Sequence, residues 1–375
     1  MRSLAISFSI LLVFPFFCSS QEIIENPEKP LSKNAGRVVR MEKVHEITDE
    51  SGEFFFKHPG NFRVAPNGDF FISDADQLLQ FDERGNFIRN LFKKGQGPGE
   101  MASMTNYQLT KEGVMIHCDS PSKILEYDYE GRLLKEIPLH QMKGHQSFKF
   151  YHSGKYYFTY IDWKKLDTFE GVVGLPYVLI SIASGGETYK ELNVFPTKSI
   201  IAVKGNIHAG AVPVDMFRVV PLQERYLVIS HTEEYWINLF DAESNQIIRK
   251  FRRTYPRIKA TDKNDKRPDL RIVWDGEVFR SPKRKYLYDV DQIWGNGECL
   301  WILTSTREEG KGYVVDVFDE SGTYIDMFFM NFPEEITEDY FHFVNSYVSA
   351  GSIFSAVKDE NDIYVIKKYR ILDDS

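Results

Sequence analysis

The polar residues best placed to bind a ligand recur at matching positions in short, strand-like segments. When these segments are aligned on the turns that follow them, one polar side chain from each falls at the same position: Arg63, Gln108, Lys149, Arg218, Gln292 and Ser346. Most of them have apolar neighbours on both sides. If the segments lie side by side, the six side chains form a ring that can bind a ligand, or they bond to backbone and water between segments.

Two further residues are candidates for ligand binding. Trp163 lies in an insertion, Asp162–Pro176, and His231 ends a strand-like segment. Together with His140, His145 and His208, His231 could contribute to a metal site, but the spacing matches no ligand motif, so we predict neither a metal nor a cofactor. No HExxH, CxxC or GxSxG motif is present, and no catalytic residue is assigned.

Three acidic residues could instead act as an acid/base pair. Asp74, Asp119 and Asp162 follow strand-like segments at similar places. Paired carboxylates can catalyse glycoside hydrolysis. Aspartate at the end of a strand is, however, more typical of turns, which is the interpretation we prefer.

The clearest pattern is a repeat of four short strands, best seen in residues 62–100. Its second hairpin has an aromatic residue, then Asp, two residues and Gly, as in Phe81–Gly85, Tyr127–Gly131 and Phe318–Gly322, with a looser copy at Phe240–Asn245. The Asp carboxylate can accept backbone N–H groups, and Gly or Asn can adopt the positive φ that closes the turn. These Asp residues therefore indicate turns rather than catalysis.

Copies of this repeat predict six blades of a β-propeller. The predicted blades cover residues 62–92, 107–138, 148–195, 217–251, 288–330 and 343–371. The last blade has only three strands, and residues 37–48 supply a lone strand near the N-terminus. We therefore predict an all-β, six-bladed propeller with four-stranded antiparallel blades, closed by the N-terminal strand, because closure leaves no open sheet edge. The domain spans 37–371, and 21–36 is predicted to be a linker.

The lengths of the connections distinguish the two faces of such a ring. We call the face with the first-to-second and third-to-fourth strand connections the turn face, because all of these are tight turns. The other is the loop-rich face, with the long connections Lys93–Asn106, Leu139–Ser147, Asp162–Pro176, Pro196–Met216, Arg252–Leu287 and Asn331–His342. Function tends to reside in elaborated loops, so we expect the ligand at the loop-rich mouth of the central channel.

One connection is strongly basic. Residues 249–285 contain 14 Lys or Arg and 5 Asp or Glu, with Trp274 and Phe279 among them. The stretch is either a patch that binds a sugar- or phosphate-bearing ligand or a solvated lid. The whole chain has 375 residues and a formal net charge of −8, which argues against a nucleic-acid partner.

The N-terminus predicts export. Residues 1–20 have Arg2, the apolar stretch Leu4–Phe17 and a small residue at Ser20, as in a cleaved signal peptide. The protein is then periplasmic or extracellular. An alternative is a lipoprotein acylated at Cys18, and only then do we expect a membrane partner, although Phe17 occupies a position where a lipobox has a small residue. Cys118 and Cys299 remain and are expected to be free thiols.

The hairpins and the Gly95–Glu100 crossover resemble NHL-type repeats, and more closely the bacterial secreted 6-bladed β-propeller proteins of unknown function. The resemblance covers residues 37–371 and is sharpest in 62–131. It implies the fold and export, and supplies no catalytic residues. We expect a binding module that recognises a glycan, peptide or protein through its loop-rich face; the alternative is a hydrolase or lyase at the channel mouth.

Overall fold

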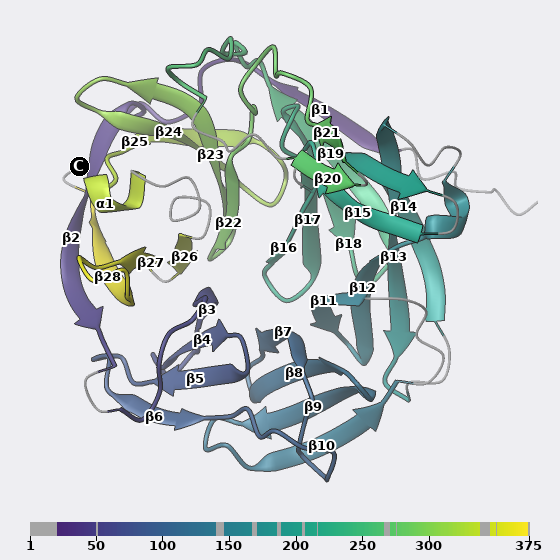
Figure 1. Ribbon diagram of the computed structural model, residues 1–375. Helices are drawn as coiled ribbons and strands as arrows, with labels where there is room; N and C mark the ends of the chain where they lie inside the picture. The colour runs from purple at the N-terminus through teal and green to yellow at the C-terminus, as the bar shows by residue number, and fades with distance from the viewer. Residues whose placement is uncertain are drawn as a thin grey trace, which may run out of the picture.

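The computed structural model describes residues 21–49, 52–139, 146–166, 171–185, 189–204, 207–215, 217–265, 271–274, 276–337, 346–349 and 351–373. In this part of the chain, antiparallel sheets are arranged as blades around a central axis (Figure 1). The predicted signal peptide, Cys18, His140 and His145 lie outside the described residues. Among those described, no helix has the length and apolar character needed to cross a membrane.

The first three blades follow one another along the chain. Blade 1 comprises β3 (Gly60–Val64), β4 (Phe70–Asp74), β5 (Gln77–Phe81) and β6 (Phe87–Asn90). Blade 2 comprises β7 (Met104–Leu109), β8 (Gly113–Asp119), β9 (Ser122–Asp128) and β10 (Leu133–Pro138). Blade 3 comprises β11 (Gln146–His152), β12 (Lys155–Ile161), β13 (Gly171–Ala183), β14 (Tyr189–Lys204) and a fifth strand, β15 (Ile207–Pro213).

The other three blades complete the circle. Blade 4 comprises β16 (Phe217–Leu222), β17 (Tyr226–His231), β18 (Trp236–Asp241) and β19 (Gln246–Arg253). Blade 5 comprises β22 (Gln292–Asn296), β23 (Cys299–Glu308), β24 (Gly312–Phe318) and β25 (Tyr324–Met330). Blade 6 comprises β26 (Tyr347–Ser349), β27 (Ser352–Lys358), β28 (Tyr364–Leu372) and β2 (Arg37–Ile47). A 3-10 helix (Trp163–Lys165) and α1 (Glu334–Thr337) lie in connections.

The N-terminal strand closes the ring, as predicted. Residues 40–47 of β2 pair antiparallel with β28, and residues 37–39 pair in parallel with β25 of the neighbouring blade. The innermost strands contact one another in a complete cycle, β3–β7–β11–β16–β22–β26 and back to β3. The chain is therefore an all-β, six-bladed propeller whose first and last segments share one sheet.

The repeating hairpins have the predicted turn chemistry. Asp82 Oδ1 accepts hydrogen bonds from the backbone N–H groups of Arg84 (2.9 Å) and Asn86 (2.8 Å). Gly85 adopts φ +88°, and Asn245 replaces glycine in blade 4 with φ +59°. Although partial burial of the carboxyl favours its neutral form, these hydrogen bonds lower the pKa of Asp82. The aspartates of these hairpins are turn residues.

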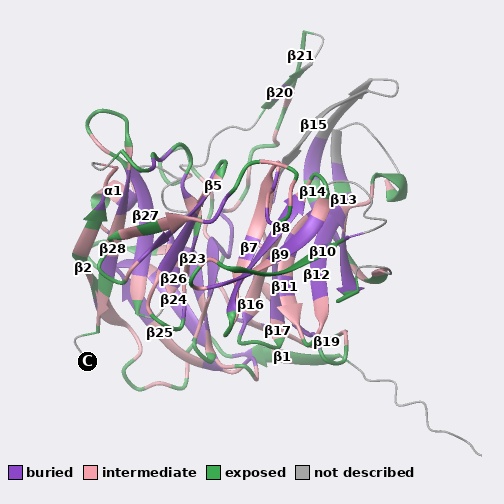
Figure 2. Cartoon of the chain, turned by 90° about the horizontal axis from the view of Figure 1, so that it is seen from below, coloured by how far each residue is buried: buried purple, intermediate pink, exposed green. Residues whose placement is uncertain are grey.

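Buried aromatic and aliphatic residues form clusters within and between blades. Figure 2 shows buried residues along the strands and most of the exposed residues in connections and on outer strands. The aromatic content is thus used for packing between sheet faces. Both remaining cysteines are free thiols, as expected: Cys118 is buried in blade 2 and Cys299 is half-buried in blade 5.

The structure corrects the prediction that residues 21–36 are a linker. Residues Glu22–Asn26 form β1, which pairs in parallel with the outer strand β19 of blade 4. The following residues run along blade 5, where Ser32 N donates to the carbonyl of Ile325 (2.9 Å). The polar composition resembled a linker because β1 adds to the outside of an existing blade, so its charged side chains are needed on the surface.

Three connections that we expected to be loops contain strands. β13 starts inside the Asp162–Pro176 insertion, and β14 and β15 extend through much of Pro196–Met216. The basic connection carries a separate hairpin, β20 (Arg271–Trp274) and β21 (Glu277–Arg280). β13 and β14 extend blade 3 beyond the four-strand repeat, and β15, β20 and β21 lie outside it, so the blade repeat gave no sign of these parts.

Candidate functional site

A cavity of about 990 Å³ opens among the tight turns that link the first and second strands of blades 1 to 4. Its lining includes the turn residues Pro66, Thr110, Lys111, Glu112, His152, Ser153, Gln223, Glu224 and Arg225, and the inner-strand residues Arg63, Gln108 and Tyr347. The cavity therefore lies on the turn face. Two of the predicted ring residues, Arg63 and Gln108, line it.

Three predicted ring residues form a cluster of positive charge around the channel, which we call the cation cluster: Arg63, Lys149 and Arg218. All three are half-buried. Burial, and then the charges of Arg63 and Arg218, lower the pKa of Lys149 to about 8. No carboxylate is among the charged groups that influence this amine within the described residues. Burial and the two neighbouring guanidinium groups thus both disfavour the charged form of Lys149.

Aromatic rings hold Arg63 in place. Its guanidinium carbon lies 5.6 Å from the ring centre of Tyr107 and 5.9 Å from that of Tyr347. Tyr107 is itself fixed, because its hydroxyl donates to the carbonyl of Phe71 (2.9 Å) and to that of Asn61. The buried Nε of Arg63 has no hydrogen-bond partner among the described residues. This leaves a donor oriented within the channel wall.

Of the other three ring residues, two form hydrogen bonds that join strands, and the third is buried. Gln108 Oε1 accepts from Tyr151 N (2.7 Å), which joins blades 2 and 3. Ser346 Oγ donates to Ser355 Oγ (3.3 Å), and Gln292 is only 7% exposed. Arg63, Lys149 and Arg218 thus lie close enough to influence one another, whereas Gln108 bonds to the backbone of the next blade and Ser346 bonds within blade 6.

The remaining two candidates lie elsewhere. Trp163 belongs to the 3-10 helix, is 37% exposed and does not line the cavity. His231 ends β17 on the loop-rich side, where its Nδ1 lies 3.3 Å from Oδ2 of the buried Asp215 and its ring packs on Phe217. In the strand register His231 lies opposite Phe217, which precedes Arg218 of the cation cluster, whereas Trp163 lies in a connection of blade 3.

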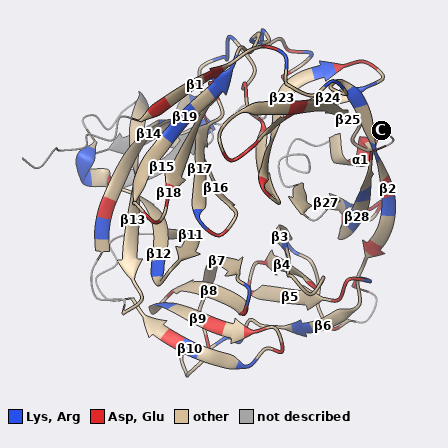
Figure 3. Ribbon diagram, turned by 180° about the vertical axis from the view of Figure 1, so that it is seen from behind, with Lys and Arg blue, Asp and Glu red and all other residues tan. Residues whose placement is uncertain are grey.

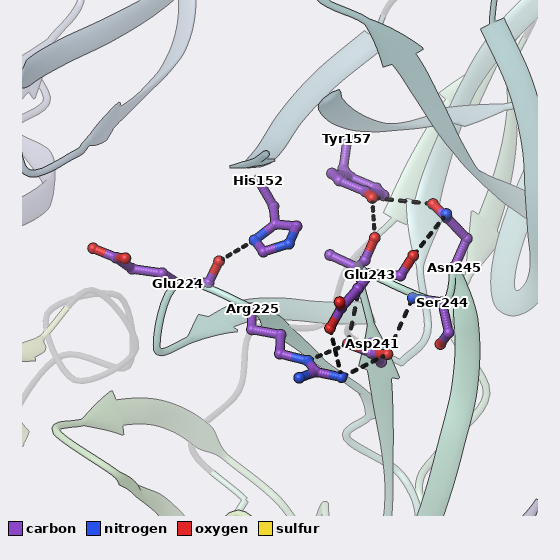
Figure 4. A network of polar contacts seen from close by, with 9 residues as sticks. His152, Tyr157, Glu224, Arg225, Asp241, Glu243, Ser244 and Asn245 are labelled. Atoms are coloured by element: carbon purple, nitrogen blue, oxygen red, sulfur yellow. Dashed lines mark hydrogen bonds and ion pairs between the residues drawn. The ribbon is translucent and has the colours of Figure 1, made fainter. Parts of the chain in front are cut away.

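The rim of the cavity is held by polar contacts between blades 3 and 4 (Figure 4). His152 Nδ1 lies 2.6 Å from the carbonyl oxygen of Glu224. This contact joins the first-to-second-strand turn of blade 3 to that of blade 4. Arg225 pairs with Asp241 through Nε (2.7 Å), and with Glu243 through Nη2 (3.0 Å). These contacts make one side of the cavity mouth rigid.

Sequence reasoning missed the rim residues because the turns that carry them are short. Each such turn contains polar residues that were assigned only to turn closure, for example Lys111 and Glu112. The signal that could have found them is their position, because each of these turns directly follows a first strand that bears one of the predicted ring residues.

The acidic candidates have structural roles. Buried Asp74 accepts hydrogen bonds from the backbone N–H groups of Lys57 (2.7 Å) and His58 (2.6 Å), and Asp162 caps the 3-10 helix. In the described part of the chain, no three His, Cys, Asp or Glu residues are grouped so that they could hold a metal ion.

Comparisons with known proteins agree with this architecture. Residues 50–192 match the family model DUF5128, described as 6-bladed beta-propeller. No curated protein matches the chain. A candidate exported protein from Bacteroides fragilis aligns with a TM-score of 0.53 and 12% identity, over 94% of this chain and 100% of that one. A DUF4221 protein from Bacteroides vulgatus aligns with a TM-score of 0.52 and 11% identity, over 90% and 99%. The chain is thus a six-bladed β-propeller that matches the DUF5128 family over residues 50–192, which confirms the resemblance inferred from its hairpins.

Proposed function

We propose that this propeller is an exported binding module that holds an anionic ligand in its central channel. The observation that carries the proposal is the cation cluster: Arg63, Lys149 and Arg218 come from three different blades and act on one another electrostatically. Half-buried like charges destabilise one another, and a bound carboxylate or phosphate offsets that cost. Three strands far apart in sequence thus contribute to one anion-binding arrangement.

The adjoining cavity suits such a ligand in size and composition. Its volume of about 990 Å³ is at the upper end of the range for small-molecule sites. Arg63 belongs both to the cavity lining and to the cation cluster, so a ligand that enters between the turns can place its acidic group on that arginine. The access that this geometry supports is the turn face rather than the loop-rich face that we expected from loop length.

Export is supported by the sequence of residues 1–20 and by the description of the Bacteroides fragilis protein as a candidate exported protein. Cleavage after Ser20 remains the prediction, with acylation at Cys18 as its alternative. Both a cleaved, exported protein and an acylated, membrane-anchored one meet carboxylated and phosphorylated cell-envelope molecules.

Isothermal titration calorimetry with citrate and inorganic phosphate tests the proposal at low ionic strength. We expect Arg63→Gln and Lys149→Met to weaken binding of the preferred probe by about tenfold or more, since charge-assisted hydrogen bonds are lost. The matched controls are Arg84→Gln and Lys135→Met, both at exposed positions. Equal affinity of the channel and control variants, or no binding of either probe, contradicts the proposal. Conversion of the bound compound during incubation favours the hydrolase or lyase alternative.

A further inference from the structure

The hairpin β20–β21 stands apart from the ring. Figure 2 shows it projecting beyond the blades, at the opposite end of the molecule from β1. It rests on the extension of blade 3, since β20 contacts β15 and β21 contacts β14. Ile272 and Phe279 lie opposite each other in the hairpin and pack with Ile200 and Val214. One face of the hairpin is therefore used for attachment.

The opposite face is apolar at its centre and basic beside it. Val273 and Val278 are cross-strand neighbours and are 60% and 48% exposed. Arg271 and Arg280 form the next pair on the same face. The two valines leave apolar surface in contact with water at the centre of this face. An apolar, solvent-exposed strand pair next to basic side chains indicates that this face meets something else.

The sheet has only two strands among the described residues, so each strand has an edge without a strand partner. Open edges are templates for strand addition, and proteins usually shield them. Here the edge lies within the connection that follows β19, residues 254–285, which carries 10 Lys or Arg against 5 Asp or Glu in a chain of net charge −8. An acidic peptide segment in an extended conformation complements this basic, open edge in both charge and hydrogen bonding.

The same molecule already contains one such pairing. β1 carries Glu22 and Glu25 and adds to the outer edge of basic β19, side by side in Figure 3. Glu22 pairs with Arg249 (2.8 Å) and Glu25 with Arg252 (2.5 Å). An acidic strand on a basic edge is thus an arrangement that this fold uses at its outer rim.

We propose that the β20–β21 hairpin is a docking site for an acidic, extended segment of a partner protein, which adds to the hairpin edge and covers Val273 and Val278. This site is separate from the channel and does not depend on its ligand. An anionic membrane is the less favoured occupant. One myristoyl chain gives only marginal membrane binding, and two valine side chains bury far less apolar surface than that.

Fluorescence anisotropy with the intact propeller, residues 21–375, tests this site. The probe is a fluorescein-labelled octapeptide of alternating Glu and Val, compared with its Lys and Val counterpart. We expect only the acidic peptide to bind, more weakly as salt increases. Arg271→Glu and the pair Val273→Asp with Val278→Asp are each expected to reduce its affinity at least about tenfold.

The matched control is Val194→Asp, because Val194 is also an exposed strand valine, 44% exposed, and lies outside the hairpin. It should bind the acidic peptide as the unmodified protein does, and the melting temperatures of all variants should agree. Equal binding of both peptides, or equal loss in the control, overturns the proposal. So does binding of phosphatidylglycerol vesicles through Val273 and Val278 without binding of the peptide.

Discussion

Lys149 is the residue whose ionisation the channel alters most clearly. Burial and the charges of Arg63 and Arg218 lower its pKa from 10.5 to about 8. In the unfolded chain this amine keeps its proton to higher pH. Between about pH 8 and pH 10.5 the unfolded state therefore binds more protons, and the free energy of unfolding should rise with pH from this residue.

This linkage leads to two expected results for Lys149→Met. Urea titrations from pH 7.5 to 10 should show that the variant lacks part of the increase in unfolding free energy seen in the unmodified protein.

An anionic ligand favours the charged amine, so its binding to the unmodified protein should weaken above about pH 8 and take up protons there. Proton uptake measured in buffers of different ionisation enthalpy checks this, with Lys135→Met as the control. An unchanged pH dependence in Lys149→Met contradicts the assignment.

For individual residues, the sequence predicted the roles of the turn residues better than the roles of the candidate ligand-binding residues. The roles of Asp82 and Gly85 follow from hydrogen bonds within a few residues, so local sequence determines them. Gln108 and Lys149 occupy equivalent positions in the repeat, yet one bonds to the next blade and the other joins a cation cluster. That difference depends on how neighbouring strands meet, which periodicity does not encode.

Among the elements, β1 shows how an outer strand is attached. Its Asn26 is 7% exposed and links two blades: Nδ2 donates to the carbonyl oxygens of Arg252 (3.1 Å) and Gly322 (2.9 Å). Its Oδ1 accepts from the N–H of Tyr324 (2.9 Å). The ion pairs of β1, by contrast, are solvent-exposed. The asparagine should therefore contribute more to attachment than the charges do.

We expect Asn26→Ala to lower the free energy of unfolding by about 2–3 kcal/mol, since it leaves the buried Tyr324 N–H without its partner. Glu22→Ala should cost less than about 1 kcal/mol, as is usual for a surface ion pair. Urea denaturation at neutral pH compares the two variants. A larger loss for Glu22→Ala would show that charge, rather than the buried amide, attaches β1.

Elements outside the four-strand repeat were the ones that sequence reasoning missed. β1 has the composition of a linker because it adds to the surface, and β20–β21 pairs locally within a charged stretch. Strands within the repeat were found because each repeat has the same alternation of apolar runs and turn residues.

For the whole molecule, stability depends on the joining of the chain's two ends. β2 is hydrogen-bonded to β25 and β28, so it links blades 5 and 6. We expect deletion of residues 21–47 to expose β28 as an open edge, to cause self-association and to remove cooperative unfolding. Deletion of residues 21–31 keeps β2 and should leave a monomer that unfolds cooperatively. Analytical ultracentrifugation and urea titration distinguish the two. A monomeric, cooperative protein without residues 21–47 would mean that ring closure is dispensable.

The parallel pairing of β1 with β19 also fixes the direction in which the chain enters the fold. β19 runs from the turn face to the loop-rich face, so Glu22 enters nearer the turn face and the chain then runs away from it. If the protein is tethered through Cys18, only a few residues separate the tether from Glu22. Such a tether would orient the cavity toward the bilayer and the β20–β21 hairpin toward the surrounding medium, so that one molecule could receive its ligand from the membrane side while engaging a soluble partner on the other.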